Sequence, residues 1–153
     1  MKKTLLISVG LLFACSTAFA STWTGTSLNN SVTKLTLIKN DSIECQGKYC
    51  SAWLANVNTD ERLQYDLHQM YVEVNCQKMS WRWTYSAGFY KGKQVTETVK
   101  EKDFAVIPPG TMGYIDAQYI CKKHKLTDDF KGSPFEIVKP VQKQLKVLRD
   151  KYK

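Results

Sequence analysis

Alternation of apolar and polar residues runs through the middle of the chain. Residues 70–76 carry an apolar residue at every second position, and residues 79–85 repeat the pattern with aromatic residues. A period of two is typical of half-buried antiparallel strands. Because only Gln77 and Lys78 separate the two runs, we expect a tight hairpin. Further strands are expected at residues 32–38, 42–46, 49–55 and 94–99, with a polar loop at 56–62.

The pattern changes to a helical period after the Ile-Pro-Pro-Gly of residues 107–110. Two prolines and a glycine end the preceding segment, and Thr111 can cap a helix over residues 112–122. Tyr114, Ala117 and Cys121 then lie on one face of this helix, at positions i, i+3 and i+7. We expect this face to pack on the strands.

A last helix is expected to begin at Pro140, because proline suits the first position of a helix. Its apolar stripe recurs at i, i+4, i+7 and i+11 and consists of Val141, Leu145, Leu148 and Tyr152. Basic residues occupy another side of the helix. The candidate binding residues on that basic side are Lys139, Lys143, Lys146, Arg149 and Lys153.

Positive charge is concentrated at the C-terminal end. Of the net charge of +8, residues 21–121 contribute nothing, because they hold ten basic and ten acidic residues. Residues 122–153 hold ten basic and four acidic residues, a balance of +6. A basic tail on a neutral domain indicates an acidic partner: lipid headgroups, a polyanionic glycan, nucleic acid or an acidic protein. A solvated helix face that only aids solubility is the commoner interpretation.

The N-terminus has the pattern of a secretion signal. A basic start precedes an apolar run at residues 4–14, and Ala-Phe-Ala at residues 18–20 matches the small-x-small cleavage pattern. The apolar run is too short to span a bilayer, which takes roughly twenty residues. We expect cleavage after Ala20 and export of the mature chain. Lipidation at Cys15 is the alternative, and the bulky Phe13 counts against it.

Four cysteines follow the signal segment, and an even count in an exported chain implies two disulfides. A two-residue hairpin loop at Gly47-Lys48 makes Cys45 and Cys50 directly opposed residues, with Cα atoms about 4.5 Å apart. These two cysteines are expected to pair locally. Cys76 is then left for Cys121, and their bond ties the helix of residues 112–122 to a strand.

No catalytic or metal-binding signature is present. The chain has only two histidines, His68 and His124. It contains no Gly-rich phosphate-binding loop, no His-Glu-x-x-His metal-binding motif and no Gly-x-Ser-x-Gly motif of a serine nucleophile. A metal site built from the cysteines with His124 would lack a paired Cys-x-x-Cys. The carboxylates at residues 60–61 and 101–103 lie in polar stretches, where such groups are usually only solvated. We predict that the protein is not an enzyme and needs no cofactor or metal.

Three aromatic residues, Trp81, Trp83 and Tyr85, are expected on one face of their strand. An aromatic ladder of this kind can hold a flat ligand such as a sugar or haem. Large rings on one strand face more often form the core, because aromatic side chains dominate core burial. We therefore expect these rings to pack beneath the helix of residues 112–122.

Several of these features together resemble one known family. They are Val-Glu-Val-Asn-Cys at residues 72–76, Tyr-Ser-Ala-Gly at 85–88, and Ile-Pro-Pro-Gly-Thr at 107–111 before a helix that ends in Cys121. In this order they are similar to the bacterial surface-adhesin protein E family. Residues 40–43 and 53–54 resemble earlier strands of that family, and the similarity covers about residues 22–124.

The resemblance implies an α+β fold, in which an antiparallel sheet of about six strands carries a helix on its concave side, held by Cys76 and Cys121. It implies a Gram-negative envelope protein, at the outer-membrane surface or in the periplasm. The family's namesake is an outer-membrane adhesin that binds host matrix and serum proteins and can form a homodimer. Such binding is a virulence function. No binding residue carries over. The Cys45/Cys50 pair and the basic tail depart from the family pattern.

We therefore expect three segments: a signal peptide at residues 1–20, an adhesin-E-like sheet domain at 21–124 and a basic helical extension at 125–153. The expected function is that of an exported envelope module that recognises host or matrix proteins. The alternative is an envelope module that docks an anionic polymer or a membrane through its basic C-terminal helix. No specific recognition of nucleic acid is expected.

Overall fold

The computed structural model describes residues 21–59, 63–98, 101–122 and 129–151. The signal segment with Cys15, the histidine at position 124 and the terminal Tyr152 and Lys153 therefore lie outside the described residues. The strands are β1 (Thr22–Leu28), β2 (Lys34–Lys39), β3 (Glu44–Gln46), β4 (Tyr49–Asn58), β5 (Leu67–Asn75), β6 (Ser80–Tyr90), β7 (Lys93–Thr98), β8 (Ala105–Val106) and β9 (Asp129–Lys131). The helices are α1 (Met112–Lys122) and α2 (Pro134–Lys151), with a 3₁₀ turn at Asn40–Ser42.

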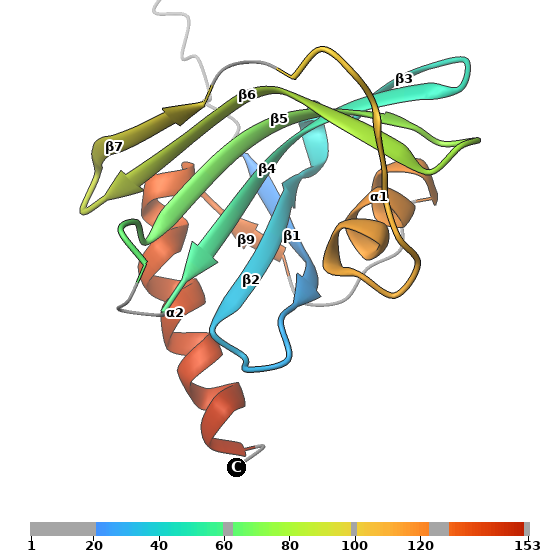
Figure 1. Ribbon diagram of the computed structural model, residues 1–153. Coiled ribbons are helices and arrows are strands. Elements are labelled where there is room, and N and C mark those ends of the chain that lie inside the picture. Colours follow the sequence, from blue (N-terminus) through green and yellow to red (C-terminus); the bar gives the residue numbers. More distant parts are fainter. Residues whose placement is uncertain (1–20, 60–62, 99–100, 123–128, 152–153) are drawn as a thin grey trace, which may run out of the picture.

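The strands form one antiparallel sheet in the order β7-β6-β5-β4-β2-β1-β9, with β3 added beside β4 and β8 beside β6 (Figure 1). Over the described residues the sheet thus has nine strands, and the expected number of about six was too low. The additional strands are β1, β8 and β9. Threonine, serine and glycine fill most of β1, so its hydrophobic alternation is weak, and β8 and β9 are only two and three residues long.

The structure confirms the central hairpin that the alternation in the sequence predicted. β5 and β6 pair from Leu67 opposite Phe89 to Asn75 opposite Ser80. Both strands are longer than the predicted runs, and Gly88 lies within β6 and does not interrupt it. β4 likewise continues to Asn58, so the loop that was expected at residues 56–62 begins later.

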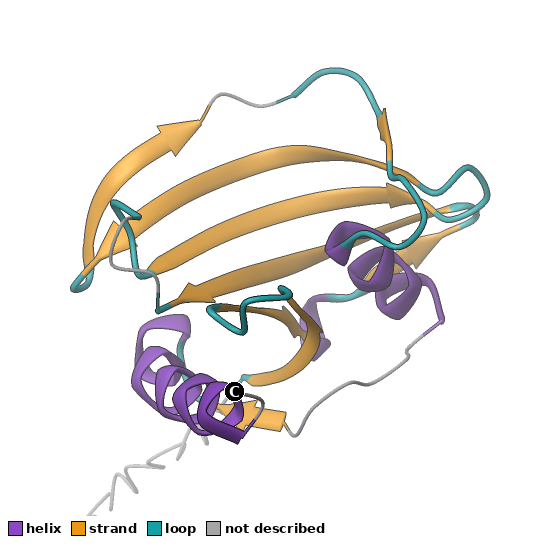
Figure 2. Cartoon of the chain, turned by 60° about the horizontal axis from the view of Figure 1, so that its bottom comes forward, coloured by secondary structure: helices purple, strands orange, loops and turns teal. Residues whose placement is uncertain are grey.

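The two helices pack against opposite faces of the sheet. Successive residues of one strand belong to different clusters: in β4, Leu54 belongs to the core cluster beneath α1, and Ala55 belongs to the cluster beneath α2. In Figure 1, α2 passes behind β4 and β5, and α1 lies at the other end of these strands. Figure 2 shows the strands as an arch, with one helix near each end.

The closeness of α1 to the sheet explains a glycine in its first turn. A Cβ atom added at Gly113 would lie 2.6 Å from the Trp81 ring of β6, far inside van der Waals contact. α1 has the predicted bounds, and Thr111 caps it, because its Oγ1 accepts the backbone N–H of Tyr114 at 3.2 Å. Glycine therefore lets the helix approach the tryptophan directly.

The last helix begins earlier than predicted. α2 starts at Pro134, so Pro140 is an interior residue and not the first. The start is fixed by a capping box, in which the Ser133 backbone N–H donates to the Glu136 carboxylate at 2.6 Å and the Glu136 N–H donates to the Ser133 hydroxyl at 3.3 Å. The prediction was wrong because Ser-Pro-Phe-Glu at residues 133–136 already contains this signal, with proline at the first helical position.

α2 is an integral part of the fold. Its buried residues, Ile137, Val138, Val141 and Leu145, join the core cluster of Leu35, Ala55, Val57 and their neighbours. The preceding strand β9 pairs with β1. Residues 129–151, which were assigned to an extension, thus contribute both a strand and four core side chains.

Both predicted disulfides are present. Cys45 and Cys50 face each other across the β3–β4 hairpin with Cα atoms 4.0 Å apart, and Gly47 has the positive φ of 60° that the expected turn requires. The Cys76–Cys121 bond joins the end of β5 to the last turn of α1, with Cα atoms 5.8 Å apart. The second bond therefore holds α1 on the sheet.

Candidate functional site: a polar pocket beside α2

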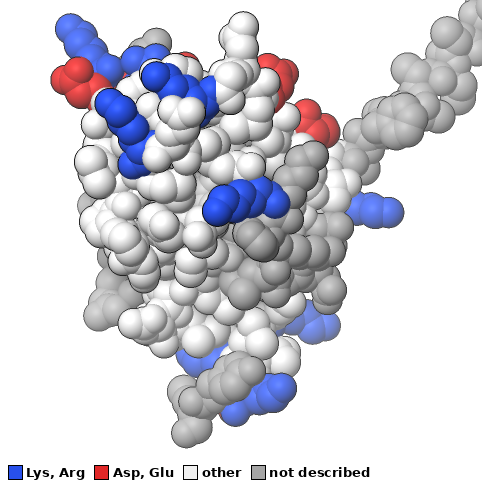
Figure 3. Space-filling view, turned by 90° about the vertical axis from the view of Figure 1, so that its right-hand side faces the viewer, with Lys and Arg blue, Asp and Glu red and all other residues white. Residues whose placement is uncertain are grey.

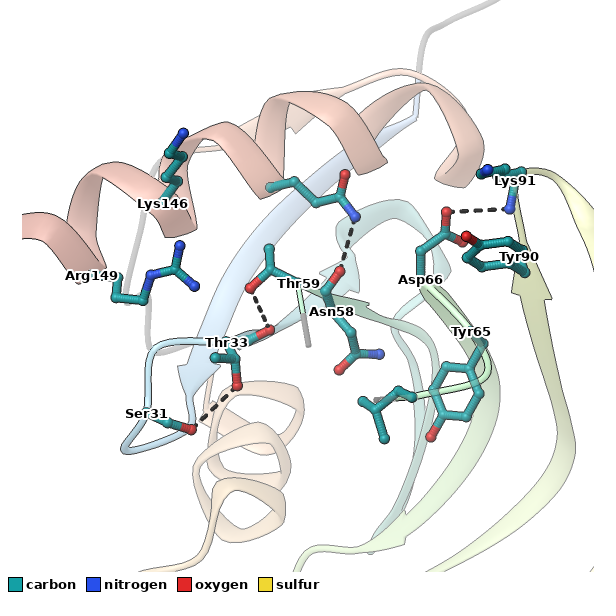
Figure 4. A pocket seen from close by; sticks show the side chains of 12 residues that line it. Ser31, Thr33, Asn58, Thr59, Tyr65, Asp66, Tyr90, Lys91, Lys146 and Arg149 are labelled. Carbon is teal, nitrogen blue, oxygen red and sulfur yellow. Dashed lines mark hydrogen bonds between the residues drawn. The ribbon is translucent and has the colours of Figure 1, made fainter. Parts of the chain in front are cut away.

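A pocket of about 860 Å³ opens where β4 ends and β5 begins. One side of it is α2, and the others are the connections from β1 to β2 and from β6 to β7 and the described residues between β4 and β5, namely Thr59, Leu63, Tyr65 and Asp66 (Figure 4). This volume lies within the range of small-molecule sites, roughly 300–1,000 Å³. Its lining residues are Ser31, Thr33, Asn58, Thr59, Leu63, Tyr65, Asp66, Tyr90, Lys91, Gln142, Lys146 and Arg149.

α2 supplies three polar side chains to the pocket. Gln142, Lys146 and Arg149 recur at i, i+4 and i+7, which places them on one side of the helix. The orientation of α2 is fixed by its buried apolar residues, which pack on the sheet. The Gln142 side-chain amide also donates to the Asn58 carbonyl at 2.9 Å, so the helix is joined to the end of β4 at the pocket.

Asn58 lies at the centre of the pocket lining (Figure 4). It is 2% exposed, and neither Nδ2 nor Oδ1 of its side-chain amide has a hydrogen-bond partner among the described residues. Its backbone is fully used, because the N–H donates to the Asp66 carbonyl at 2.9 Å and the carbonyl accepts from Gln142. Its side chain has the parity of Leu54 in β4 and therefore points to the face of the sheet opposite α2 (Figure 4).

Over the described residues, the pocket lining carries more positive than negative charge. It contains the cations Lys91, Lys146 and Arg149 and, among the described residues, a single carboxylate, Asp66. The Asp66 carboxylate accepts the backbone N–H of Lys91 at 3.2 Å, which fixes its position at one edge. The hydroxyls of Ser31, Thr33, Thr59 and Tyr65 make up much of the remaining polar surface.

The structure brings together only part of the predicted basic face. Lys146 and Arg149 line the pocket, whereas Lys139 and Lys143 are exposed on α2 and do not line it, and Lys153 lies outside the described residues. Asn58 and Lys91 were not predicted, because they come from segments far from α2 in the sequence. On the side of the molecule in Figure 3, basic side chains are spread over a mostly uncharged surface, and some lie near the C-terminal end.

The expected aromatic ladder is divided between the two faces of the sheet. Trp81 and Trp83 pack against the core cluster beneath α1, as predicted. Tyr85 faces the other side, because a bulge shifts the pairing register between Tyr71 opposite Tyr85 and Val72 opposite Trp83. Tyr85 instead contacts Trp53, with ring centroids 5.4 Å apart. The prediction of three rings on one face was therefore wrong for Tyr85.

Among the described residues three titratable groups have shifted pKa values, and none of them lines the pocket. The hydrogen bond from the Ser133 backbone N–H lowers the pKa of Glu136. Burial, followed by the charge of Lys34, lowers the pKa of His68, whose Nε2 lies 2.6 Å from the Ser86 hydroxyl. Burial raises the pKa of Asp116 in α1 to about 6. The Asp116 carboxylate accepts hydrogen bonds from two hydroxyl groups of β1, so it is held in a fixed position.

The cysteine sulfurs cluster at the end of α1. Those of Cys50, Cys76 and Cys121 all lie within 4.8 Å of one another, and the sulfurs of Cys50 and Cys76 are 3.5 Å apart. Each is already bonded in a disulfide, and thiolate is the form of cysteine that binds metals. His124, which the alternative metal site combines with the cysteines, lies outside the described residues.

Comparison with known proteins found no match to a family model, a curated protein or a solved structure. The resemblance to the adhesin family therefore stays a prediction. Among the described residues, neither α1 nor α2 has both the length and the apolar character needed to cross a bilayer.

Proposed function

We propose that the protein is an exported binding protein of the cell envelope that recognises an anionic polymer through α2. The observation that carries this proposal is the placement of the basic residues. Lys139, Lys143 and Lys146 are exposed on α2, and Lys146 and Arg149 also reach the positively charged pocket. Exposed lysines at i, i+4 and i+7 form a row along α2 that ends at the pocket, and such a row suits a flexible polyanion, because successive charges can bind along the helix.

Export is supported by two kinds of observation. The N-terminal sequence has the basic, apolar and small-residue regions of a signal peptide. The two disulfides suit an oxidising compartment, because reducing conditions in the cytosol keep most thiols unpaired. We place the mature chain in the periplasm or at the outer-membrane surface.

A polymer is favoured over a membrane because the apolar side of α2 is already used. Helices that bind in a membrane interface bury their apolar face among the lipids. In this protein Ile137, Val141 and Leu145 are at most 1% exposed and pack against the sheet. α2 therefore offers charge to a ligand, and among its described large apolar side chains only Phe135 and Val147 are exposed.

The proposal predicts that neutralising the exposed face of α2 weakens binding to heparin, used as a model polyanion. The variant Lys139→Gln/Lys143→Gln/Lys146→Gln is expected to bind roughly tenfold or more weakly at low salt, and the slope of log K against log salt should fall by up to about three, one for each lost contact. Affinity would be measured by titration of the mature chain at several salt concentrations.

The matched control is Lys48→Gln/Lys78→Gln/Lys93→Gln, which removes the same charge from exposed positions outside α2. Deleting α2 is not a suitable test, because its core side chains would be lost as well. Equal losses in the two triple variants would show a general charge effect and would contradict a binding role for α2. Binding to anionic vesicles in place of heparin would redirect the proposal to a membrane.

Recognition of host matrix or serum proteins is the second candidate function. It is supported by the resemblance and by the disulfide-tethered helix on an antiparallel sheet, which matches the fold that the resemblance implies. This function predicts binding to immobilised matrix protein that changes little between low and high salt. A homodimer, which the resemblance also suggests, would be detected by light scattering of the mature chain.

A further inference from the structure

We propose that the two disulfides form one thiol-exchange site, at which a small external thiol opens the Cys45–Cys50 bond and the exchange then releases the disulfide that holds α1. This inference goes beyond the proposed function, because it concerns the crosslinks and not the basic face of α2. The β3–β4 hairpin, which carries Cys45 and Cys50, lies at the same end of the sheet as α1 (Figure 1).

Cys45 is the sulfur that an external thiol can reach. The residue is exposed, whereas Cys50 is 5% exposed. Both cysteines line a groove of about 400 Å³, in which the charged residues are Glu44 and Glu73. Arg82 pairs with Glu73, so Glu44 sets the charge of the described groove lining. A neutral or cationic thiol therefore suits this groove better than an anionic one.

The Cys50 sulfur lies next to the second disulfide. Its Sγ is 3.5 Å from that of Cys76, and the sulfurs of Cys50, Cys76 and Cys121 all lie within 4.8 Å of one another. The three side chains share the core cluster beneath α1, so they lie on the same face of the sheet. Because an S–S bond is about 2.05 Å long, Cys50 and Cys76 need to approach by only about 1.5 Å to bond.

The exchange consists of two steps, each an attack of a thiolate on a disulfide sulfur. In the first, the external thiolate bonds to the Cys45 sulfur, and Cys50 leaves as a thiolate. In the second, the Cys50 thiolate bonds to the Cys76 sulfur, and Cys121 leaves as a thiolate that takes a proton from water. One external thiol is consumed and one cysteine thiol is formed, so the two steps need no other oxidant or reductant.

The second step is close to balanced in chain entropy. The Cys76–Cys121 bond has a sequence separation of 45 residues, and a Cys50–Cys76 bond has one of 26, whereas loop entropy varies only with the logarithm of loop length. After the exchange, α1 is held on the sheet by its noncovalent core contacts. The redox state of the hairpin disulfide therefore controls the covalent tether of α1.

The test is incubation of the oxidised mature chain with cysteamine, a small cationic thiol, followed by alkylation with iodoacetamide and peptide mass spectrometry. Cysteamine is expected on Cys45, together with a Cys50–Cys76 crosslink. Iodoacetamide is expected on Cys121 at least roughly tenfold more often than on Cys50, because Cys50 is buried and its thiolate is consumed by the exchange. Alkylation mainly at Cys50, cysteamine mainly on Cys76 or Cys121, or no adduct at all would each overturn the proposal.

The matched variants are Cys45→Ala and Cys50→Ala, each of which leaves one hairpin cysteine without its partner. In Cys45→Ala the free sulfur is Cys50, beside Cys76, so iodoacetamide should label Cys121 without any cysteamine. In Cys50→Ala the free sulfur is Cys45, which is not one of the three clustered sulfurs, so only Cys45 should be labelled. Equal labelling of Cys121 in the two variants would contradict an exchange through Cys50.

The preferred charge of the thiol is tested with 3-mercaptopropionate, an anionic thiol, at the same thiolate concentration as cysteamine. It should form less adduct at Cys45, and Glu44→Gln should reduce the difference between the two thiols, because Glu44 repels the anionic one. More adduct with 3-mercaptopropionate than with cysteamine would contradict the assigned class of thiol.

Discussion

Replacing Cys76 and Cys121 together by alanine is expected to lower the free energy of unfolding by about 4 kcal/mol. The bond closes a loop with a sequence separation of 45 residues, and the loss of chain entropy in the unfolded state gives this magnitude. A typical domain has only about 5–15 kcal/mol of stability, so the variant should unfold at a much lower urea concentration. Urea denaturation of the oxidised mature chain, followed by tryptophan fluorescence, measures the change.

The comparison variant is Cys45→Ala/Cys50→Ala. This disulfide has a sequence separation of only five residues, for which the same entropy model gives about 2 kcal/mol. Both cysteines of each bond must be replaced. The sulfurs of Cys50 and Cys76 are 3.5 Å apart, so a single free thiol at Cys76 could exchange with the neighbouring disulfide. If Cys45→Ala/Cys50→Ala lowers the free energy of unfolding more than Cys76→Ala/Cys121→Ala does, Cys76–Cys121 is not the main crosslink of the fold.

Short patterns in the sequence were sufficient to predict the central hairpin, α1 and the Cys45–Cys50 disulfide, because each depends on residues that are close together in the chain. The alternation along β5 and β6 depends on successive side chains facing opposite sides of the sheet, and it identified the central hairpin. The bounds of α1 followed from two prolines, a glycine and a capping threonine. The Cys45–Cys50 pair followed from hairpin geometry, because a two-residue loop fixes which residues face each other.

Features that depend on contacts between distant segments were not predicted. The bulge in β6 adds one residue to one strand, and this reverses the direction of Tyr85 relative to Trp83 without a clear mark in the sequence. β9 is three residues long and exists because β1 is beside it. The start of α2 was the exception, since the capping box at residues 133–136 was present in the sequence.

The candidate site was predictable only on its helical side. Lys146 and Arg149 follow from helical spacing, which needs no knowledge of the fold. Asn58 has no such signal, because an asparagine at the end of a strand usually belongs to a solvated turn. Its backbone carbonyl accepts a hydrogen bond from Gln142 of α2, whereas its side chain points to the opposite face of the sheet, so its place in the pocket depends on the fold as a whole. Lys91 reaches the same pocket because β5 and β6 are paired along their full length.

Asp116 determines the second large effect, a loss of stability as the pH rises. This residue is 3% exposed, and its Oδ1 accepts hydrogen bonds from the hydroxyls of Thr26 at 2.6 Å and Ser27 at 2.7 Å. Burial is the largest cause of its shift and raises its pKa from 3.8 to about 6, although the two hydroxyls and the charge of Lys34 act in the opposite direction. The folded state therefore holds the Asp116 proton more tightly than the unfolded state does.

The sign of the pH dependence follows from this difference. Between pH 3.8 and about 6 the folded state binds more protons at Asp116 than the unfolded state, so stability falls as the pH rises. Below this range the carboxyl group is neutral in both states and carries no penalty. Above it the full penalty applies, which amounts to about 3 kcal/mol for a shift of this size.

Asp116→Asn is therefore expected to stabilise the protein at pH 8 by up to about 3 kcal/mol and to have little effect at pH 4, because asparagine keeps the shape and the acceptor oxygen without the charge. The measurement is urea denaturation of both proteins across this range. His68, whose pKa is lowered, acts in the opposite direction, because its stability contribution is lost as the pH falls below 6.5. That contribution is common to both proteins and cancels in their difference. Asp150→Asn, at an exposed position of α2, is the control. If the free energies of unfolding of wild type and Asp116→Asn differ by the same amount at pH 4 and pH 8, ionisation of Asp116 does not destabilise the folded state, and the prediction is wrong.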